Sequence, residues 1–377
     1  MAFFSINTVY FRNLANATVD TAAKDIFLVG ENGQGKTNFL EALYFCAYAS
    51  SFRGVKDADL VRCGELDFST TAVFGQLQSN EKNLLFPAIP LSSKIILKVE
   101  KLKKSITLNG KNITDRKEML DMVPVVIFCH EDMEFVSGSQ EKRRWFFDQT
   151  QSLYDPVYLD DLRKYRRVLK TRNTVLKDAK AGGDYYKINE LLDALDPQLD
   201  EYGMRLMEKR SIAAERFSAV FSPLYREVSG IEGINVSYAP SWTGYSLKKR
   251  LIDRRTADLA QAVTLSGPHR DRYRFIQNQR ATEFSYNAST GQCRLLALLL
   301  RIAQARCFSD LTGKMPVLLL DDVLLELDGE KRRRFLSVMP EYEQAFFTFL
   351  PEEPYKNYSK SGTLVYYVKN GVVGKAV

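Results

Sequence analysis

The chain has only two histidines among its 377 residues, His130 and His269, which leaves no material for a zinc site built on histidine. Its five cysteines are scattered without a C-x-x-C pair, so we expect reduced, mostly buried thiols of a cytosolic protein. No stretch approaches about 18 consecutive apolar residues, and the N-terminus has no basic-then-apolar signal segment. We therefore expect a cytoplasmic protein with no membrane partner.

The composition favours a globular protein. A hydrophobic content of 45% over this length can form the cores of two or three domains. The net charge of +7 and the isoelectric point near 8.9 favour polyanionic partners, although an excess of this size is only suggestive.

The most specific motif lies at residues 30–37, GENGQGKT, which fits G-x-x-x-x-G-K-[ST]. An apolar run at 26–29 precedes it and a helical pattern follows at 38–48, which makes a glycine-rich turn without a ligand the weaker interpretation. Glycines let successive N–H groups point at one anion, the lysine reaches the β- and γ-phosphates, and the threonine hydroxyl can ligate Mg²⁺. The sequence therefore predicts an ATP and Mg²⁺ site formed by Gly30, Glu31, Asn32, Gly33, Gln34, Gly35, Lys36, Thr37 and Asn38.

A second acidic motif lies roughly 280 residues downstream, where the apolar run 317–320 ends in Asp321 and Asp322. We assign Asp321 to the metal ion and Asp322 to the attacking water; an Asp-Asp turn after a core strand is the alternative. The separation predicts that a large insertion divides the ATPase.

A third motif opens an apolar helix after residue 289. Ser289 is a good N-cap, and Gly291 permits close backbone approach at the helix N-terminus. With Gln292 and in this order along the chain, the motif resembles the signature of ABC-type ATPases. That resemblance implies a head-to-tail dimer in which these three residues contact ATP held by the partner, with Asp328 in the D-loop at 325–328.

Over essentially its full length the chain resembles the RecF family of the ABC/SMC-type ATPase class. The segments that carry the resemblance are 11–14 (FRNL, with Arg12 and Asn13), 30–42, 51–53 (SFR), 128–148, 266–271 (SGPHRD) and 321–328. His130, Leu325 and the segment 346–349 (FFTF) depart from related patterns, since proline, a small polar residue and a switch histidine are expected there. A missing histidine agrees with slow hydrolysis used as a switch.

The resemblance implies an α/β fold, an ABC-type ATPase head with an antiparallel β subdomain and an inserted helical arm. Lobe I would comprise residues 1–128 and 312–377, and lobe II residues 129–311 with the arm at about 156–221. The implied function is ATP-dependent DNA binding in recombinational repair and replication-gap processing. ATP-driven dimerisation and slow, DNA-dependent hydrolysis would assist RecA loading, together with RecR and RecO.

The periodicity of the inserted region supports a helical arm. We expect strands at 68–78, 94–101 and 104–113 with a turn at Asn109 and Gly110, and a helix at 156–180. After a turn at 181–184, we expect a helical stretch to 221 that Pro197 breaks in two, with Asp196 capping the second helix. The segment 229–262 gives no clear pattern.

Basic residues gather on one predicted helix, where Arg163, Arg166, Arg167 and Lys170 are neighbours. A solvated charged face is as plausible as contact with the phosphates of single-stranded DNA or of gapped or junction duplex. Two interpretations of Arg270 are open in the sequence: it joins a DNA surface, or it pairs with Asp271 or a carboxylate of the site.

Three alternative functions differ in class from this interpretation. A transporter-type ATPase subunit would carry a switch histidine, and an SMC-like chromosome protein would carry a much longer coiled coil. An overcoming-lysogenisation-type nuclease would need a domain after Asp328, where only about fifty residues remain.

Overall fold

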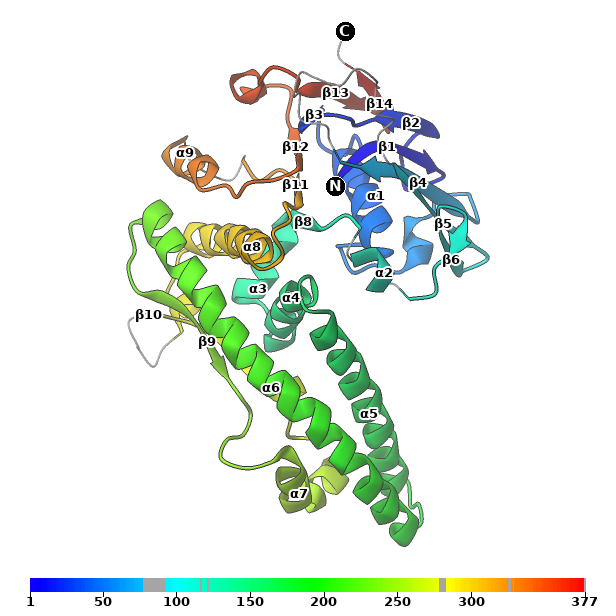
Figure 1. Ribbon diagram of the computed structural model, residues 1–377, viewed down its shortest axis with the longest axis vertical. Coiled ribbons are helices and arrows are strands. Elements are labelled where there is room, and N and C mark those ends of the chain that lie inside the picture. The colour runs from blue at the N-terminus through cyan, green and yellow to red at the C-terminus, as the bar shows by residue number, and fades with distance from the viewer. Residues whose placement is uncertain are drawn as a thin grey trace. The chain divides into compact units, whose positions relative to one another are not determined.

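The apolar run before the glycine-rich loop forms β3 (Asp25–Val29), and all five of its residues are buried in the computed structural model of the chain. The structure describes residues 1–76, 92–115, 117–120, 122–277, 283–324, 327 and 329–375. They fall into two compact units, Met1–Asp132 with Phe308–Val377, and Met133–Cys307. In Figure 1 the first unit is blue to cyan and orange to red, and the second is green to yellow.

β3 belongs to a six-stranded sheet in the first unit, with the order β14-β13-β3-β12-β11-β8. All of its strands run parallel except β14. The carboxyl ends of parallel strands meet at one edge, so the segments after β3, β11 and β12 gather there. The other strands are β8 (Val125–Phe128), β11 (Val317–Leu320), β12 (Gln344–Phe349), β13 (Leu364–Lys369) and β14 (Val372–Lys375).

The second sheet of this unit is antiparallel and has the order β2-β1-β4-β5-β6-β7. The three expected strands are confirmed, with the third forming β6 and β7; residues 77 and 78 lie outside the described residues. Asn109 and Gly110, both with positive φ, make the expected turn. The strands are β1 (Ala2–Val9), β2 (Ala17–Asp20), β4 (Phe68–Gly75), β5 (Ser93–Glu100), β6 (Lys103–Leu108) and β7 (Lys111–Asn112).

Helix α1 (Lys36–Tyr48) contacts strands of both sheets, which explains why its sequence is apolar on nearly every side. Because α1 is buried, its N-terminus is held at the end of the glycine-rich loop. The shorter helices of the unit are η1 (Asp57–Leu60), α2 (Lys117–Leu120), η2 (His130–Asp132), α9 (Gly329–Ser337) and η5 (Tyr355–Tyr358).

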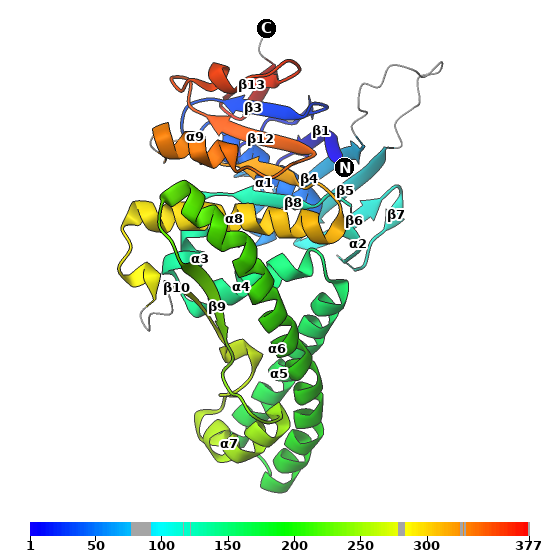
Figure 2. The ribbon, with the colours of Figure 1, turned by 60° about the vertical axis from the view of Figure 1, so that its left-hand side comes forward.

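The second unit is dominated by two long helices, α5 (Pro156–Lys180) and α6 (Tyr185–Ser229), which lie side by side in both ribbon views (Figures 1 and 2). α7 (Leu247–Gln261) packs against them. The apolar stripe predicted for 156–180 forms the contact: Leu162 and Tyr165 of α5 lie in one buried cluster with Leu199 and Leu206 of α6.

The expected break at Pro197 is wrong, because α6 continues through Pro197 and Pro223. Asp196 does not cap a helix; its buried carboxylate accepts hydrogen bonds from Arg172 and Arg255. Leu192 and Leu199, on either side of the proline, are fully buried. This packing holds the helix straight through the position where Pro197 removes one backbone hydrogen bond.

The segment 229–262, which had no clear pattern, forms the end of α6, β9 (Ile234–Ala239) and α7. β9 pairs with β10 (Arg272–Gln277). The unit also contains α3 (Met133–Ser137), α4 (Gln140–Ser152), η3 (Pro268–Arg270), η4 (Phe284–Tyr286) and most of α8 (Thr290–Thr312).

All five cysteines lie among the described residues and none forms a disulfide; four of them are buried, as expected. Among the described residues, no helix combines the length and the apolar character needed to cross a bilayer.

Candidate nucleotide site and its surroundings

The glycine-rich loop has the shape of a phosphate-binding loop. Gly33 and Gly35 have φ values of 77° and 114°, which favour glycine, and Gly35 leads directly into α1. A Cβ on Gly35 would lie 3.0 Å from Asn13 Oδ1, so a larger residue is disfavoured there. The Lys36 ammonium lies inside the loop, where Nζ donates to the carbonyls of Gly30 (2.6 Å) and Glu31 (3.2 Å).

The turn at residues 11–14 supports this loop. Asn13 Nδ2 donates to the Gly33 carbonyl (3.3 Å), and Asn38 Nδ2 donates to Asn13 Oδ1 (2.8 Å). Arg12 makes two hydrogen bonds to the buried carboxylate of Glu41 on α1. The structure thus brings Asn13 to the loop and Arg12 to α1, and the expected contact of both residues with the nucleotide stays a prediction.

The turn between β13 and β14 holds the loop from another direction. The N–H of Asn370 donates to Gln34 Oε1 (2.7 Å), and the N–H of Gly371 donates to the Gln34 carbonyl (2.9 Å). Because the side chain of Gln34 is used in this way, its position is fixed by the last hairpin of the chain. Sequence reasoning had named Gln34 without this support.

The acidic pair lies at the same edge of the sheet. Thr37 Oγ1 donates to Asp321 Oδ1 at 2.9 Å. Burial, together with the neighbouring Asp322 carboxylate, raises the pKa of Asp321 to about 7. A hydroxyl beside a desolvated carboxylate is an oxygen donor set that fits Mg²⁺, and the glycine N–H groups fit the phosphates of a nucleotide.

Thr348 on β12 lies between the two motifs and was not named as a site residue. Its Oγ1 accepts from the Asp322 N–H (2.7 Å) and donates to Asp322 Oδ1 (2.8 Å). In the sequence, the segment 346–349 stood out only because it lacks the switch histidine. Strand β12 lies between β3 and β11, and this sheet order places Thr348 beside Asp322.

Glu353 is a second residue that sequence reasoning missed. It accepts a hydrogen bond from the Leu350 N–H (2.7 Å) in the loop after β12. Burial raises the pKa of its carboxyl group, and the negative charge of Asp322 acts in the same direction. No local sequence motif marks Glu353, because only the strand order brings it to the edge of the sheet where Asp322 lies.

Of the other residues predicted to bind the nucleotide, some lie in the second unit and one lies outside the described residues. Asp328, like Leu325, lies outside the described residues. In the second unit, Ser289 caps α8: its Oγ accepts from the Gln292 N–H, and Gln292 Oε1 accepts from the Ser289 N–H. Ser289 is exposed, and no atom lies within 4 Å of a Cβ built on Gly291.

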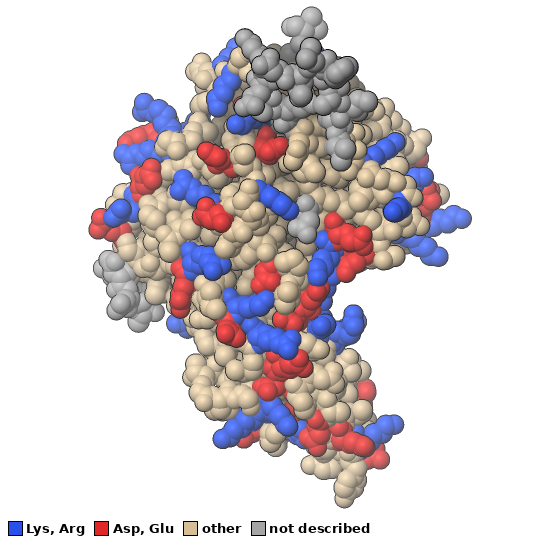
Figure 3. All heavy atoms as spheres, in the orientation of Figure 1, with Lys and Arg blue, Asp and Glu red and all other residues tan. Residues whose placement is uncertain are grey.

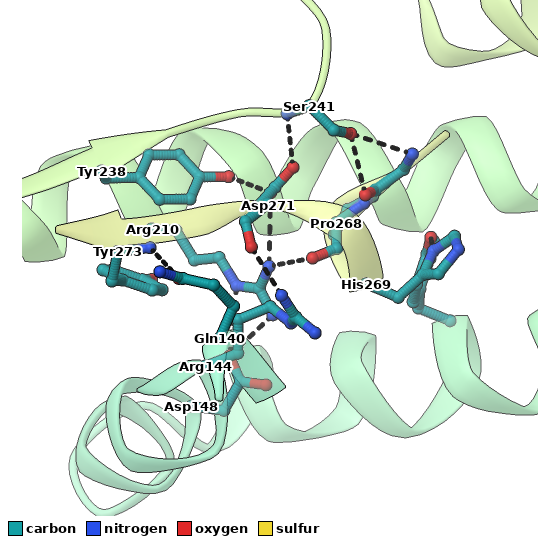
Figure 4. A network of polar contacts seen from close by, with 12 residues as sticks. Gln140, Arg144, Asp148, Arg210, Tyr238, Ser241, Pro268, His269, Asp271 and Tyr273 are labelled. Carbon is teal, nitrogen blue, oxygen red and sulfur yellow. Dashed lines mark hydrogen bonds and ion pairs between the residues drawn. The ribbon is translucent and has the colours of Figure 1, made fainter. Parts of the chain in front are cut away.

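A buried polar network fixes the segment 266–271 in the second unit (Figure 4). Arg210 of α6 pairs with Asp148 of α4 (2.8 Å) and with Asp271 (3.3 Å), and it donates to the Pro268 carbonyl. Arg270 does not pair with Asp271; its guanidinium lies 3.4 Å from the Thr264 carbonyl. This segment is therefore held by a structural network rather than by its own neighbouring charges.

The four basic residues predicted to contact DNA lie on α5. Arg166, Arg167 and Lys170 are exposed and Arg163 is half-buried. Arg166 forms an ion pair with Asp148 at 3.2 Å. On the face seen in Figure 3, basic and acidic side chains alternate, so net charge alone does not mark a binding surface there.

Comparison with known proteins gives matches along the whole chain. The model of the RecF/RecN/SMC N-terminal domain family matches residues 4–373. The DNA replication and repair protein RecF of Treponema pallidum is 39% identical over 370 residues, covering 97% of this chain and 99% of that protein. RecF of Moorella thermoacetica is 33% identical over 344 residues, covering 91% and 88%.

The chain is also similar to solved structures. The structure of the recombination mediator protein RecF with ATP, in the RecFOR pathway, has a TM-score of 0.87 at 28% identity and covers 100% of this chain and 97% of that one. The Smc head domain of Pyrococcus furiosus, bound to the C-terminal domain of ScpA, has a TM-score of 0.54 at 16% identity, covering 99% and 95%. The second likeness concerns the fold alone, which is that of an ABC-type ATPase head.

Proposed function

Because the chain belongs to the RecF/RecN/SMC N-terminal domain family, and within it to the RecF proteins, we propose that it is an ATP-gated DNA-binding dimer. Its function is that of a DNA replication and repair protein in recombinational repair, and it is an ATPase of this class. The transporter-type and SMC-like alternatives lose support, since relatives named RecF match nearly the full length and the Smc head is only 16% identical.

The observation that carries the ATPase proposal is the contact between Thr37 and Asp321, which joins two motifs 284 residues apart. The loop N–H groups and Lys36 hold the β- and γ-phosphates, and Thr37 and Asp321 hold Mg²⁺. When bound, the ion neutralises charge that develops on the phosphates. Asp322 accepts a proton from the attacking water, and Thr348 fixes the orientation of its carboxylate.

The dimer part of the proposal rests on the exposed N-terminus of α8. Ser289, Gly291 and Gln292 of one protomer would contact the γ-phosphate held by the partner. Asp328, which the resemblance also assigns to the nucleotide, lies outside the described residues. We assign the first unit to ATPase lobe I and the second to lobe II with its arm. Hydrolysis would be slow, because Thr348 rather than a histidine stands beside Asp322 and supplies no base.

The partners follow from the same family. We propose that the ATP-bound dimer binds DNA at single-strand gaps and junctions and works with RecR and RecO in the cytoplasm to assist RecA loading. The DNA contacts come from Arg163, Arg166, Arg167 and Lys170 on α5, and they hold phosphates rather than bases.

Light scattering with and without ATP and Mg²⁺, and with and without gapped duplex, tests the proposal. We expect a monomer without nucleotide, a dimer with saturating ATP, and stable DNA binding by the dimer. A chain that stays monomeric with ATP bound would contradict the dimer. DNA binding of equal strength without nucleotide would contradict the ATP gate.

A further inference from the structure

A shallow groove of about 330 Å³ runs along one face of α5. Successive lining positions are one to four residues apart over about three helical turns, so they form one continuous stripe on the helix surface. The lining residues are Arg166, Leu169, Lys170, Asn173, Thr174 and Lys177. Only Arg166 and Lys170 belong to the basic set recognised in the sequence.

The groove is positively charged without a matching carboxylate among its lining residues. Lys170 and Lys177 are both exposed; Lys177 lies at one end of the groove and Lys170 lies near its middle. Arg166 does have a partner, Asp148, but that single carboxylate is shared with the buried Arg210. Arg210 also pairs with Asp271, so two guanidinium groups face two carboxylates there. The excess positive charge of the groove therefore comes from Lys170 and Lys177.

Asn173 adds a neutral donor whose orientation is fixed. Its Oδ1 accepts hydrogen bonds from the N–H of Thr264 (2.9 Å) and from the Thr264 hydroxyl (2.8 Å). A backbone N–H can only donate, so the amide oxygen must face Thr264 and the amide nitrogen must point away from it. Within the described residues this nitrogen makes no hydrogen bond, and it is left as a donor for a ligand.

The position of Thr264 is itself held by buried groups. Its hydroxyl accepts from Arg172, and its carbonyl contacts His269 Nε2 at 2.9 Å and lies near the Arg270 guanidinium. The segment 266–271 thus supports Asn173 through Thr264. A donor fixed before the ligand arrives loses little conformational entropy on binding.

We propose that this groove binds the phosphate backbone of DNA: Arg166, Lys170 and Lys177 neutralise successive phosphates, and the Asn173 amide donates to one phosphate oxygen. Leu169 lies between these groups and provides an apolar contact for a sugar. The hydroxyl of Thr174, the other neutral polar lining residue, donates to the Lys170 carbonyl (3.2 Å), so it offers no donor to a base edge. We therefore expect binding to be independent of sequence. The inference rests on the proposed ATP-dependent DNA binding and assigns its site.

Two variants test the groove in the full-length chain. Lys170→Ala/Lys177→Ala removes two phosphate contacts, and we expect the slope of log affinity against log salt to fall by about 1.4–1.8, that is, by about 0.7–0.9 per contact. Asn173→Asp keeps the oxygen that faces Thr264 but replaces the donor by a negative charge. We expect it to weaken DNA binding about tenfold or more.

The matched control is Lys180→Ala/Lys187→Ala, which removes the same charge from exposed positions on the arm outside the groove. Binding of a fluorescent gapped duplex is measured with saturating ATP and Mg²⁺ at several salt concentrations, and ATP turnover is measured in parallel. The proposal is supported if both groove variants lose DNA affinity and the control variant keeps it. All variants should retain the ATP turnover measured without DNA.

Equal losses in the groove and control variants would overturn the proposal in favour of general charge on the arm. So would wild-type affinity in the groove variants. Loss of binding to poly-glutamate with unchanged DNA binding would instead assign the groove to an acidic protein. If the wild-type chain with ATP binds no DNA, the proposed function fails together with the groove.

Discussion

At the scale of single residues, Asp322 has an unusual backbone. Its φ of 51° lies in the left-handed region, and its N–H and carboxylate both contact Thr348 Oγ1. Asparagine and aspartate tolerate this conformation better than other residues with a side chain. Asp322→Asn is therefore the variant that removes the charge with the least disturbance of the backbone.

We expect Asp322→Asn to bind ATP normally and to lower ATP turnover about 100-fold or more, because the attacking water loses its proton acceptor. The ATP-bound dimer should accumulate. Single-turnover hydrolysis with a nucleotide-binding assay measures both effects. Turnover equal to that of the wild type would show that another residue is the catalytic base.

Lys36→Ala provides the contrast. No other side chain within the described part of the loop replaces the ammonium at Gly30 and Glu31, so this variant should lose ATP binding itself. If its ATP affinity stays within about threefold of the wild type, the assignment of the phosphate loop is wrong.

The sequence predicted those parts of the site that have a local motif. The loop at 30–37 and the pair Asp321 and Asp322 follow from residue types next to apolar runs. Thr348 and Glu353 have no such motif, because their place depends on β12 lying between β3 and β11. Strand order is a property of long-range pairing, and the spacing of residues along the chain does not contain it.

At the scale of elements, the arm is held by buried ion pairs as well as by its apolar stripe. Arg172 of α5 is fully buried and pairs with Asp196 of α6 and Asp258 of α7, each at 2.8 Å. One side chain thus links three helices. The predicted break at Pro197 ignored these contacts, and a local rule for proline was outweighed by tertiary packing.

We expect Arg172→Ala to destabilise the second unit by about 3–5 kcal/mol. The buried Asp258 carboxylate loses its arginine partner, and Asp196 keeps only Arg255. Lys142→Ala removes an exposed lysine paired with the exposed Glu134 in the same unit, and it should cost less than about 1 kcal/mol. The chain has two tryptophans, so Trp145→Phe leaves the buried Trp242 as the reporter of urea unfolding. Equal losses of unfolding free energy in the two variants would show that the buried ion pairs contribute no more than an exposed pair.

His269 gives the second unit a pH-dependent stability. Burial is the main cause that lowers the pKa of its imidazole from the ordinary value of 6.5 to about 4. Its Nδ1 lies 2.7 Å from the Tyr165 hydroxyl and its Nε2 faces the Thr264 carbonyl, which fits the neutral ring with the proton on Nε2. The unfolded chain binds the proton more readily than the folded one.

The free energy of unfolding therefore has its full value with respect to His269 above about pH 6.5. It decreases as the pH falls to about 4, and the decrease is about 3 kcal/mol at most. His269→Gln should flatten the decline of unfolding free energy in that window. Urea unfolding of both proteins between about pH 4 and about pH 7 measures the two profiles. Identical profiles for the wild type and His269→Gln would contradict a neutral buried His269.

At the scale of the whole molecule, the proposed dimer would build each nucleotide site from the first unit of one protomer and the second unit of its partner. The first unit has the phosphate loop and the acidic pair, and the second exposes the capped N-terminus of α8 with its unused backbone N–H groups. A head-to-tail dimer would complete each site with the partner's α8. This arrangement makes dimerisation and ATP binding depend on each other, a coupling that must be equal in both directions.

Ser289→Arg separates this arrangement from an ATPase that works as a monomer. The larger cation would block approach of the partner at α8, while Lys36 and Thr37 of the same chain remain intact. We expect a chain that binds ATP, stays monomeric, and loses both hydrolysis and ATP-dependent DNA binding. If Ser289 is only a helix cap, the variant should lose about 1 kcal/mol of stability and nothing else.

Ser289→Ala is the matched control for that capping effect, since it removes the same hydroxyl without adding bulk or charge. Light scattering at saturating ATP and Mg²⁺ then compares three proteins: wild type and Ser289→Ala should dimerise, and Ser289→Arg should not. A normal dimer of Ser289→Arg would rule out a site completed by the partner. The ATPase would then have to be explained by residues of one chain alone.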